Sequence, residues 1–158
     1  MRQPFRARLS AYLRASLLVG AVGLGLSGFS NGSSAADTGI PRSERPADAR
    51  IYFITPETGE VLASPVTVRF GLKNMGVAPA GVDKPHTGHH HLIVDAELPP
   101  MNLPIPNNDH YRHFGAGQTE FDLVLAPGSH TLQLLLGDQN HVPHDPPVVS
   151  ERITITVE

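Results

Sequence analysis

The chain has 158 residues, of which 40% are hydrophobic and 17% are charged, and its formal net charge is −3. It contains nine histidines but no cysteine, which excludes disulfide bonds and thiolate metal ligands. Without its arginine-rich beginning the chain keeps eight basic and fifteen acidic side chains. The resulting charge of about −7 argues against partners such as nucleic acid or an anionic membrane.

Residues 1–36 have the pattern of an export signal. A segment with four arginines precedes an apolar stretch from about Leu17 to Leu26, and Ser34-Ala35-Ala36 supplies the small residues that a signal peptidase needs. The apolar stretch is short beside a membrane-spanning helix of about 20 residues, so we expect cleavage and no stable membrane anchor. The sequence therefore predicts Sec export, to the periplasm or out of the cell.

Residues 37–50 are polar and contain glycine and proline, which predicts a flexible leader before a domain over 51–158. In that domain, strict alternation of apolar and polar side chains predicts half-buried strands at VTVRFGL, TEFDLVLA and ERITITVE. Shorter β-branched or apolar runs add further strands at 51–55, 90–96 and 129–137. About seven short strands with closely spaced turns predict an all-β fold, an antiparallel immunoglobulin-like β-sandwich.

Two long irregular segments interrupt the strands, from about Lys73 to Gly88 and from Leu98 to Gly117. Structureless loops of this length in a small domain are usually functional or disordered. Both segments border histidines, so we expect them to be functional loops and not disordered ones.

The first histidine group, His89-His90-His91, lies at the start of an expected strand. Side chains alternate between the faces of a strand, so His89 and His91 share one face, about 7 Å apart, and can converge on one ion. Asp95 suggests that this face is open. His90 falls on the other face with Leu92 and Val94, where a partly buried histidine bonded to a backbone carbonyl is the simpler interpretation.

The other two groups lie in connections between strands. His141 and His144 occupy a proline-stiffened loop with two carboxylates, Asp138 and Asp145, although such carboxylates can also merely cap backbone donors of a turn. In the second irregular segment, His113 precedes Phe114 and is a better ligand candidate than His110. Of the two isolated histidines, His86 lies in a stretch expected to be mobile and is not expected to have a function, and His130 is expected to be structural.

The sequence therefore predicts one metal site, whose expected ligands are His89, His91, His113, His141 and His144. Imidazole nitrogen suits copper and zinc, and neighbouring carboxylates would orient the rings by hydrogen bonds. A thioether from Met75 or Met101 would favour copper, whereas ordinary packing is the alternative for both methionines.

Three segments resemble a secreted bacterial family, the domain-of-unknown-function family 4399. They are NMGVAPAGVDKPHTGHHHLIVD, PIPNNDHYRHFGAGQTE and HTLQLLLGDQNHVPHDPPVVSE. The resemblance spans the chain from about Ile51 onward and implies a single periplasmic immunoglobulin-like domain, without implying an activity. The family's motif histidines map to His89, His90, His91, His113, His141 and His144. A looser similarity to copper oxygenases fails, because these need an N-terminal histidine and the expected mature chain begins with Asp37.

Three functions are compatible with these patterns. The leading hypothesis is a periplasmic binding module whose histidine-lined site holds copper or zinc. The alternative is a structural or protein-interaction domain of the envelope, with a histidine cluster that binds no metal. A metal-dependent enzyme is the third hypothesis, and the sequence offers no GxSxG, HExxH or phosphate-loop motif in its favour.

Overall fold

The computed structural model describes residues 40–158. The expected export signal, residues 1–36, lies outside the described residues, as do the first three residues of the expected leader. Among the residues that are described, no helix has the length and the apolar character needed to cross a membrane.

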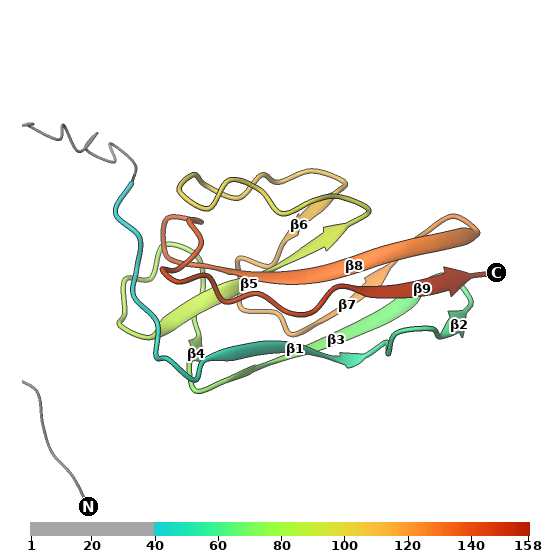
Figure 1. Cartoon of the computed structure of the whole chain (residues 1–158), viewed down its shortest axis with the longest axis horizontal. Coiled ribbons are helices and arrows are strands. Elements are labelled where there is room, and N and C mark those ends of the chain that lie inside the picture. Colours follow the sequence, from blue (N-terminus) through green and yellow to red (C-terminus); the bar gives the residue numbers. More distant parts are fainter. Residues whose placement is uncertain (1–39) are drawn as a thin grey trace, which may run out of the picture. The chain divides into compact units, whose positions relative to one another are not determined.

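The described residues form nine strands and no helix, in two sheets (Figure 1). The smaller sheet has the order β1-β3-β7 and consists of β1 (Arg50–Thr55), β3 (Val66–Lys73) and β7 (Glu120–Leu123). The larger sheet has the order β2-β9-β8-β5-β4, with β6 also paired to β5; its strands are β2 (Val61–Leu62), β9 (Ile153–Val157), β8 (Gly128–Gly137), β5 (Thr87–Val94), β4 (Gly76–Val77) and β6 (Tyr111–His113). The predicted all-β class is confirmed. Most neighbours are antiparallel, and β2 with β9 and β4 with β5 are parallel.

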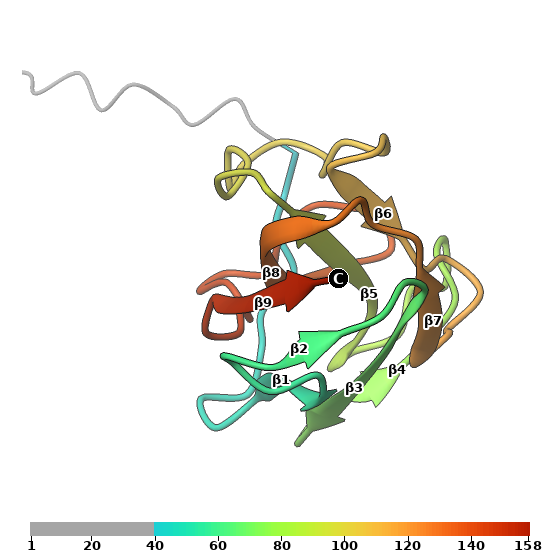
Figure 2. The ribbon, with the colours of Figure 1, turned by 90° about the vertical axis from the view of Figure 1, so that its right-hand side faces the viewer.

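The two sheets pack face to face, with β1 and β3 forming one layer and β8 and β9 the other (Figure 2). Their inner faces share one hydrophobic core, because the apolar positions of each alternating strand point inward. The predicted alternation is confirmed in β3 and β9, where every second residue from Val66 to Phe70 and from Ile153 to Val157 is buried.

β5 crosses the middle of the larger sheet and is buried from Gly88 to Val94. β8 pairs with one edge of β5, and β4 and β6 pair with the other. One face of β5 belongs to the shared core through Leu92 and Val94, while Ile93 packs in a second apolar cluster with Ile105 and Leu135. The strand therefore separates the three consecutive histidines, as the alternation predicted.

His90 points into the core and is fully buried. Its ring packs on Phe70, with ring centroids 4.7 Å apart. Neither ring nitrogen makes a hydrogen bond of normal geometry, although a backbone contact with Gln118 partly offsets the effect of burial on the pKa of the ring. The expected bond to a backbone carbonyl therefore stays a prediction. Burial lowers the pKa of His90 to about 4, which keeps the imidazole neutral near pH 7.

Residues 42–45, which belong to the segment expected to be a flexible leader, contact the rest of the domain. The backbone N–H of Asp145 donates to the carbonyl of Ser43 at 3.0 Å, and Arg42 Nε donates to the carbonyl of Pro143 at 2.9 Å. Arg42 also donates to the carbonyl of His144. The sequence did not suggest these contacts, because they join residues about 100 positions apart. The division of the chain at residue 50 stays a prediction.

Candidate metal centre

β5 provides the first two side chains of the site, His89 and His91. Both lie on the outer face of the larger sheet and are 1% and 0% exposed, because loops cover this face. Their ring centroids are 4.8 Å apart, and none of their four ring nitrogens has a hydrogen-bond partner. The predicted shared face is confirmed, but it is not open. Asp95 does not continue it, since its φ of 51° turns the chain away after Val94.

β6 adds His113, which lies directly opposite His91 in the antiparallel register. Opposed residues of neighbouring strands hold their side chains within contact distance. The His113 ring centroid is accordingly 5.1 Å from that of His91 and 4.9 Å from that of His89. Its Nε2 is buried without a hydrogen-bond partner.

The turn after β8 adds His141. Its ring centroid lies 4.9 Å from that of His89, 4.8 Å from that of His113 and 6.2 Å from that of His91. The backbone of His141 has a φ of 65°, a left-handed conformation that costs a residue other than glycine about 1 kcal/mol or more. The N–H of His141 donates to the carbonyl of Asp138 at 2.9 Å, which closes the turn.

Asp138 holds this turn in shape. Its Oδ1 accepts hydrogen bonds from the backbone N–H groups of Asn140 at 2.8 Å and Val142 at 3.0 Å. Its Oδ2 accepts one from the Ser43 hydroxyl at 3.0 Å. The expectation that this carboxylate orients a histidine ring by a hydrogen bond is wrong, because backbone donors and Ser43 take its oxygens. Asp145, the other expected carboxylate, is exposed and pairs with Arg42 at 3.2 Å.

His144 is the expected ligand that the structure keeps apart. Its Nε2 lies 3.1 Å from the carbonyl oxygen of Thr87, and its ring is not among those that pack together. The contact with Thr87 holds this part of the loop against the beginning of β5, and Arg42 binds the carbonyl of His144. The structure therefore brings four of the five expected ligands together, namely His89, His91, His113 and His141.

Burial favours the neutral form of His89, His91 and His113. Burial, together with the smaller effect of the neighbouring histidines, lowers the pKa of His89 to about 4 and that of His91 to about 2. The pKa of His113 is also lowered, by burial and by His141. The charge of Asp138 offsets part of the effect at His89. A neutral imidazole has a free lone pair on one ring nitrogen, which is the form that binds metal ions.

Three of the rings could hold a metal ion together. One ring nitrogen from each of His89, His91 and His113 lies within 4.8 Å of the other two. Nitrogens bound at about 2.1 Å to one tetrahedral ion are about 3.4 Å apart, so modest ring movements would bring these atoms into range. Buried polar atoms without partners are unfavourable, and an ion that accepts their lone pairs would relieve this cost.

Glycines make room for two of the rings. A Cβ atom on Gly137, which lies beside β5 opposite His89, would be 2.8 Å from Cε1 of His91. A Cβ atom on Gly115 would be 2.6 Å from Nε2 of His113. Such distances are shorter than van der Waals contact, so any larger residue would displace the rings. Sequence reasoning missed both glycines, although Gly115 stands two residues after a candidate ligand.

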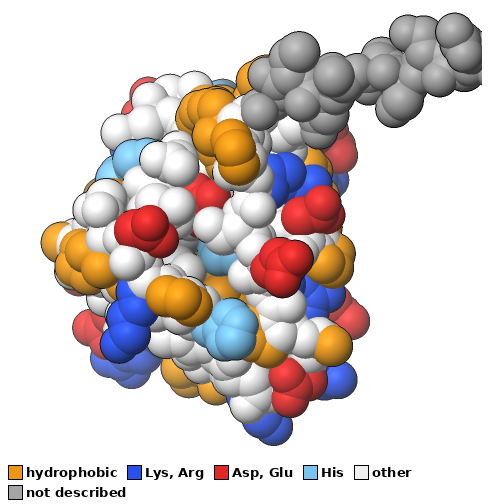
Figure 3. Space-filling view, turned by 90° about the vertical axis from the view of Figure 1, so that its left-hand side faces the viewer, with side chains coloured by type: hydrophobic (Ala, Val, Ile, Leu, Met, Phe, Trp, Pro, Cys, Tyr) orange, Lys and Arg blue, Asp and Glu red, His pale blue; other side chains and the backbone are white. Residues whose placement is uncertain are grey.

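The two long irregular segments lie over the site, as their backbone hydrogen bonds show. The first segment donates from Ala80 to the carbonyl of Gly115 at 2.8 Å and from Gly81 to that of Gln139 at 3.1 Å. The second donates from Ile105 to the carbonyl of His141 at 2.8 Å. Histidine side chains reach the surface at the end of the domain where β5 begins (Figure 3).

Both methionines have packing positions. Met75 packs against the shared core, and Met101 packs against the cluster of Ile93, Ile105 and Leu135. Ordinary packing, the alternative stated above, therefore accounts for both thioethers. The four clustered histidines then offer nitrogen atoms as the only side-chain donors of the candidate site.

Comparison with known proteins gives one match. The family described as Domain of unknown function (DUF4399) matches residues 68–158, which include all four clustered histidines. No curated protein and no solved structure matches the chain.

Proposed function

The chain belongs to this family, and we propose that its domain is a binding module for a transition metal ion, copper(II) or zinc. The observation that carries the proposal is the meeting of four imidazoles from three separate elements, with the nitrogens of His89 and His91 buried and without hydrogen bonds. We assign His89, His91, His113 and His141 as the ligands and place His144 outside the set.

The chemistry of the donors supports the choice of metal. Imidazole suits copper(II) and zinc, whereas copper(I) prefers sulfur ligands, and both described methionines pack in apolar clusters. At a given nitrogen site copper(II) generally binds more tightly than zinc. We therefore expect copper(II) to show the higher affinity of the two.

The cellular location and the finer fold are also proposals. The export pattern of residues 1–36 supports a periplasmic or secreted protein, and a site without thiolates suits an oxidising compartment. Two packed sheets of mainly antiparallel strands support an immunoglobulin-like sandwich.

In a histidine cluster that only stabilised the fold, we would expect the ring nitrogens to be hydrogen-bonded. Buried polar groups that serve stability are normally hydrogen-bonded to protein or water. His130 has this character, because its Nδ1 is 2.6 Å from Asp95 and its Nε2 is 2.8 Å from the carbonyl of Ala126. His89 and His91 lack any such bond. This contrast favours a ligand site over an envelope interaction domain.

Titration calorimetry with zinc and with copper(II), on protein purified without a histidine tag, tests the proposal. We expect a Kd tighter than about 10 μM for at least one ion, which corresponds to roughly −7 kcal/mol. The double variant His91→Ala with His141→Ala removes one deep and one loop ligand, and it should weaken binding by about a hundredfold or more, since each lost nitrogen donor costs a coordinate bond.

His90→Leu is the matched control, because it removes the neighbouring imidazole of the same strand from the opposite face. Its metal affinity should equal that of the wild-type protein. An equal loss in both variants, or the absence of binding in the wild-type protein, would contradict the proposal and favour the interaction domain.

A further inference from the structure

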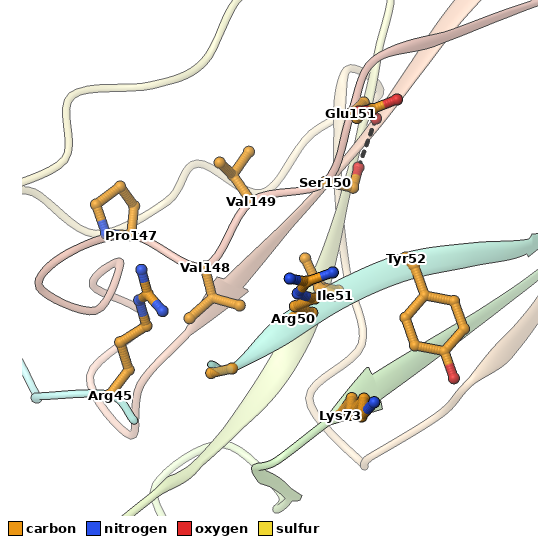
Figure 4. A pocket seen from close by; sticks show the side chains of 11 residues that line it. Arg45, Arg50, Ile51, Tyr52, Lys73, Pro147, Val148, Val149, Ser150 and Glu151 are labelled. Carbon is orange, nitrogen blue, oxygen red and sulfur yellow. Dashed lines mark hydrogen bonds between the residues drawn. The ribbon is translucent and has the colours of Figure 1, made fainter. Parts of the chain in front are cut away.

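A groove that contains none of the clustered histidines runs along the side of the domain where β1 lies. It has a volume of about 490 Å³ between β1 and the segment from Pro147 to Glu151. A second hollow of about 310 Å³ continues it along Tyr52 and Phe53 toward Pro56. Figure 4 shows β1 with Arg50 and Tyr52 on one wall and Val148 and Ser150 on the other. Ile51, a core residue, lies at the base.

One wall of the groove is the free edge of a strand. β1 is the last strand of its sheet and pairs only with β3, and no backbone hydrogen bond joins its outer edge to another described residue. The backbone of the opposite wall is already hydrogen-bonded: Leu136 of β8 donates to the carbonyl of Val148, and Ser150 donates to the carbonyl of Leu134. An exposed edge with unpaired N–H and C=O groups is a template for an added strand.

The groove also gathers positive charge in an acidic domain. Residues 40–158 carry eight basic and fourteen acidic side chains. Four of the basic side chains form ion pairs with carboxylates. Three of the other four line the groove, namely Arg45, Arg50 and Lys73. A single carboxylate, that of Glu151, lines the same part.

Two of these cations stand directly opposite each other. Arg50 and Lys73 are partners in the antiparallel register of β1 and β3, and neither has a carboxylate within ion-pair distance. Like charges opposed across a strand pair are destabilising. An acidic group beside them would remove this repulsion, so the pair favours an anionic partner.

We propose that the edge of β1 binds an extended acidic peptide segment as an additional strand. Alternate side chains of such a segment would lie toward the apolar base of the groove and toward Arg50 and Lys73, because a strand presents its residues to two faces. A second copy of this domain would bring the same two cations to the edge. Residues 1–39 carry four arginines and one aspartate, so they lack the required charge as well.

The test uses an eight-residue peptide of alternating aspartate and valine with blocked termini, added to the isotopically labelled protein. We expect the backbone amide resonances of Ile51, Tyr52 and Phe53 to shift. Affinity should fall about tenfold or more in the variant Arg50→Glu with Lys73→Glu, because both cations would be replaced by repelling charges. Lys84→Glu is the matched control, since Lys84 also lacks an ion pair and lies outside the groove, and its affinity should equal that of the wild-type protein.

Two further peptides separate charge from strand pairing. A peptide with lysine in place of aspartate, and an acidic peptide with every second amide methylated, should both lose binding. The proposal is overturned if either of them binds as well as the acidic peptide. Shifts confined to residues away from β1, or no binding at about 1 mM peptide, overturn it too. All measurements use metal-free protein, so the outcome is independent of the proposed metal site.

Discussion

At the scale of single residues, the packing of the four clustered histidine rings depends on two glycines, which have no side chain to occupy the space of the rings. His113 occupies space that a Cβ atom on Gly115 would fill, and the same holds for His91 and Gly137. Gly137 is fully buried in β8, so a substitution there would also disturb the fold. Gly115 is only partly buried and follows β6, which makes it the better position for a test of ring placement.

The substitution Gly115→Ala should weaken metal binding by about tenfold, because the new methyl group turns His113 away and removes one nitrogen donor. Titration calorimetry with zinc measures the effect. Gly76→Ala is the matched control, since a Cβ atom there would lie 3.2 Å from a methyl group of Thr87 and 3.9 Å from the carbonyl oxygen of His86, and near none of the clustered rings. Equal affinity in the two variants would show that the position of His113 does not matter for binding.

At the scale of elements, an ion pair between Asp95, the residue after β5, and His130 of β8 links the end of β5 to β8. His130 of β8 has its Nδ1 2.6 Å from the carboxylate of Asp95, which also accepts a hydrogen bond from the N–H of Thr131 at 2.7 Å. Burial raises the pKa of Asp95, but the hydrogen bonds with His130 and Thr131 outweigh it and hold this pKa below 3.8. The bond to Asp95 raises the pKa of His130 above 6.5.

The pair should therefore stabilise the fold most between about pH 4 and pH 6.5, where both groups are charged even in the unfolded chain. Its contribution is lost as the pH rises through the raised pKa of His130, and as it falls through the lowered pKa of Asp95. His110 lies close enough for its charge to lower the pKa of Asp95 as well. Both partners are partly exposed, so the magnitude is that of a surface pair.

Urea unfolding of the wild-type protein and of Asp95→Asn, both without metal, measures this contribution. The wild-type protein should exceed the variant by about 0.2–1 kcal/mol more near pH 5.5 than near pH 9. The buried histidines affect both proteins alike and cancel in the comparison. A difference between the proteins that does not change with pH would show that the ion pair is not the cause.

The same elements show what the sequence could predict. Alternation alone predicted β3 and β9 and the shared face of His89 and His91, because side-chain direction in a strand is a local property. The placement of His113 depends on the pairing of β6 with β5, a nonlocal choice that no spacing in the sequence specifies. The ring of His144 lies apart from that of its loop neighbour His141, since a loop without regular geometry gives neighbouring residues no common direction.

At the scale of the whole molecule, the site lies where distant parts of the chain meet. The proposed ligands come from a central strand, from a short edge strand and from a turn, and residues 42–43 bind that turn. Unfolding would separate all of these parts. An ion that binds the folded chain alone must therefore stabilise the entire domain.

Zinc at a hundred times its Kd should raise the free energy of unfolding by about 2.7 kcal/mol. For a domain of this size, the melting temperature should rise by roughly 10 °C. Differential scanning calorimetry measures this, and a chelator should reverse the gain. Magnesium is the control ion, because it prefers oxygen ligands and should leave the melting temperature unchanged. An equal rise with magnesium would point to a general ionic effect.

The packing of Met75 and Met101 in apolar clusters leaves the ring cluster with nitrogen donors only, in a chain that has no cysteine. Peroxide and other oxidants inactivate many metal-binding proteins by converting thiolates to sulfenic acids and thioethers to sulfoxides. None of the four clustered side chains can undergo these conversions. Neither of these two routes of ligand loss is therefore open to the proposed metal site.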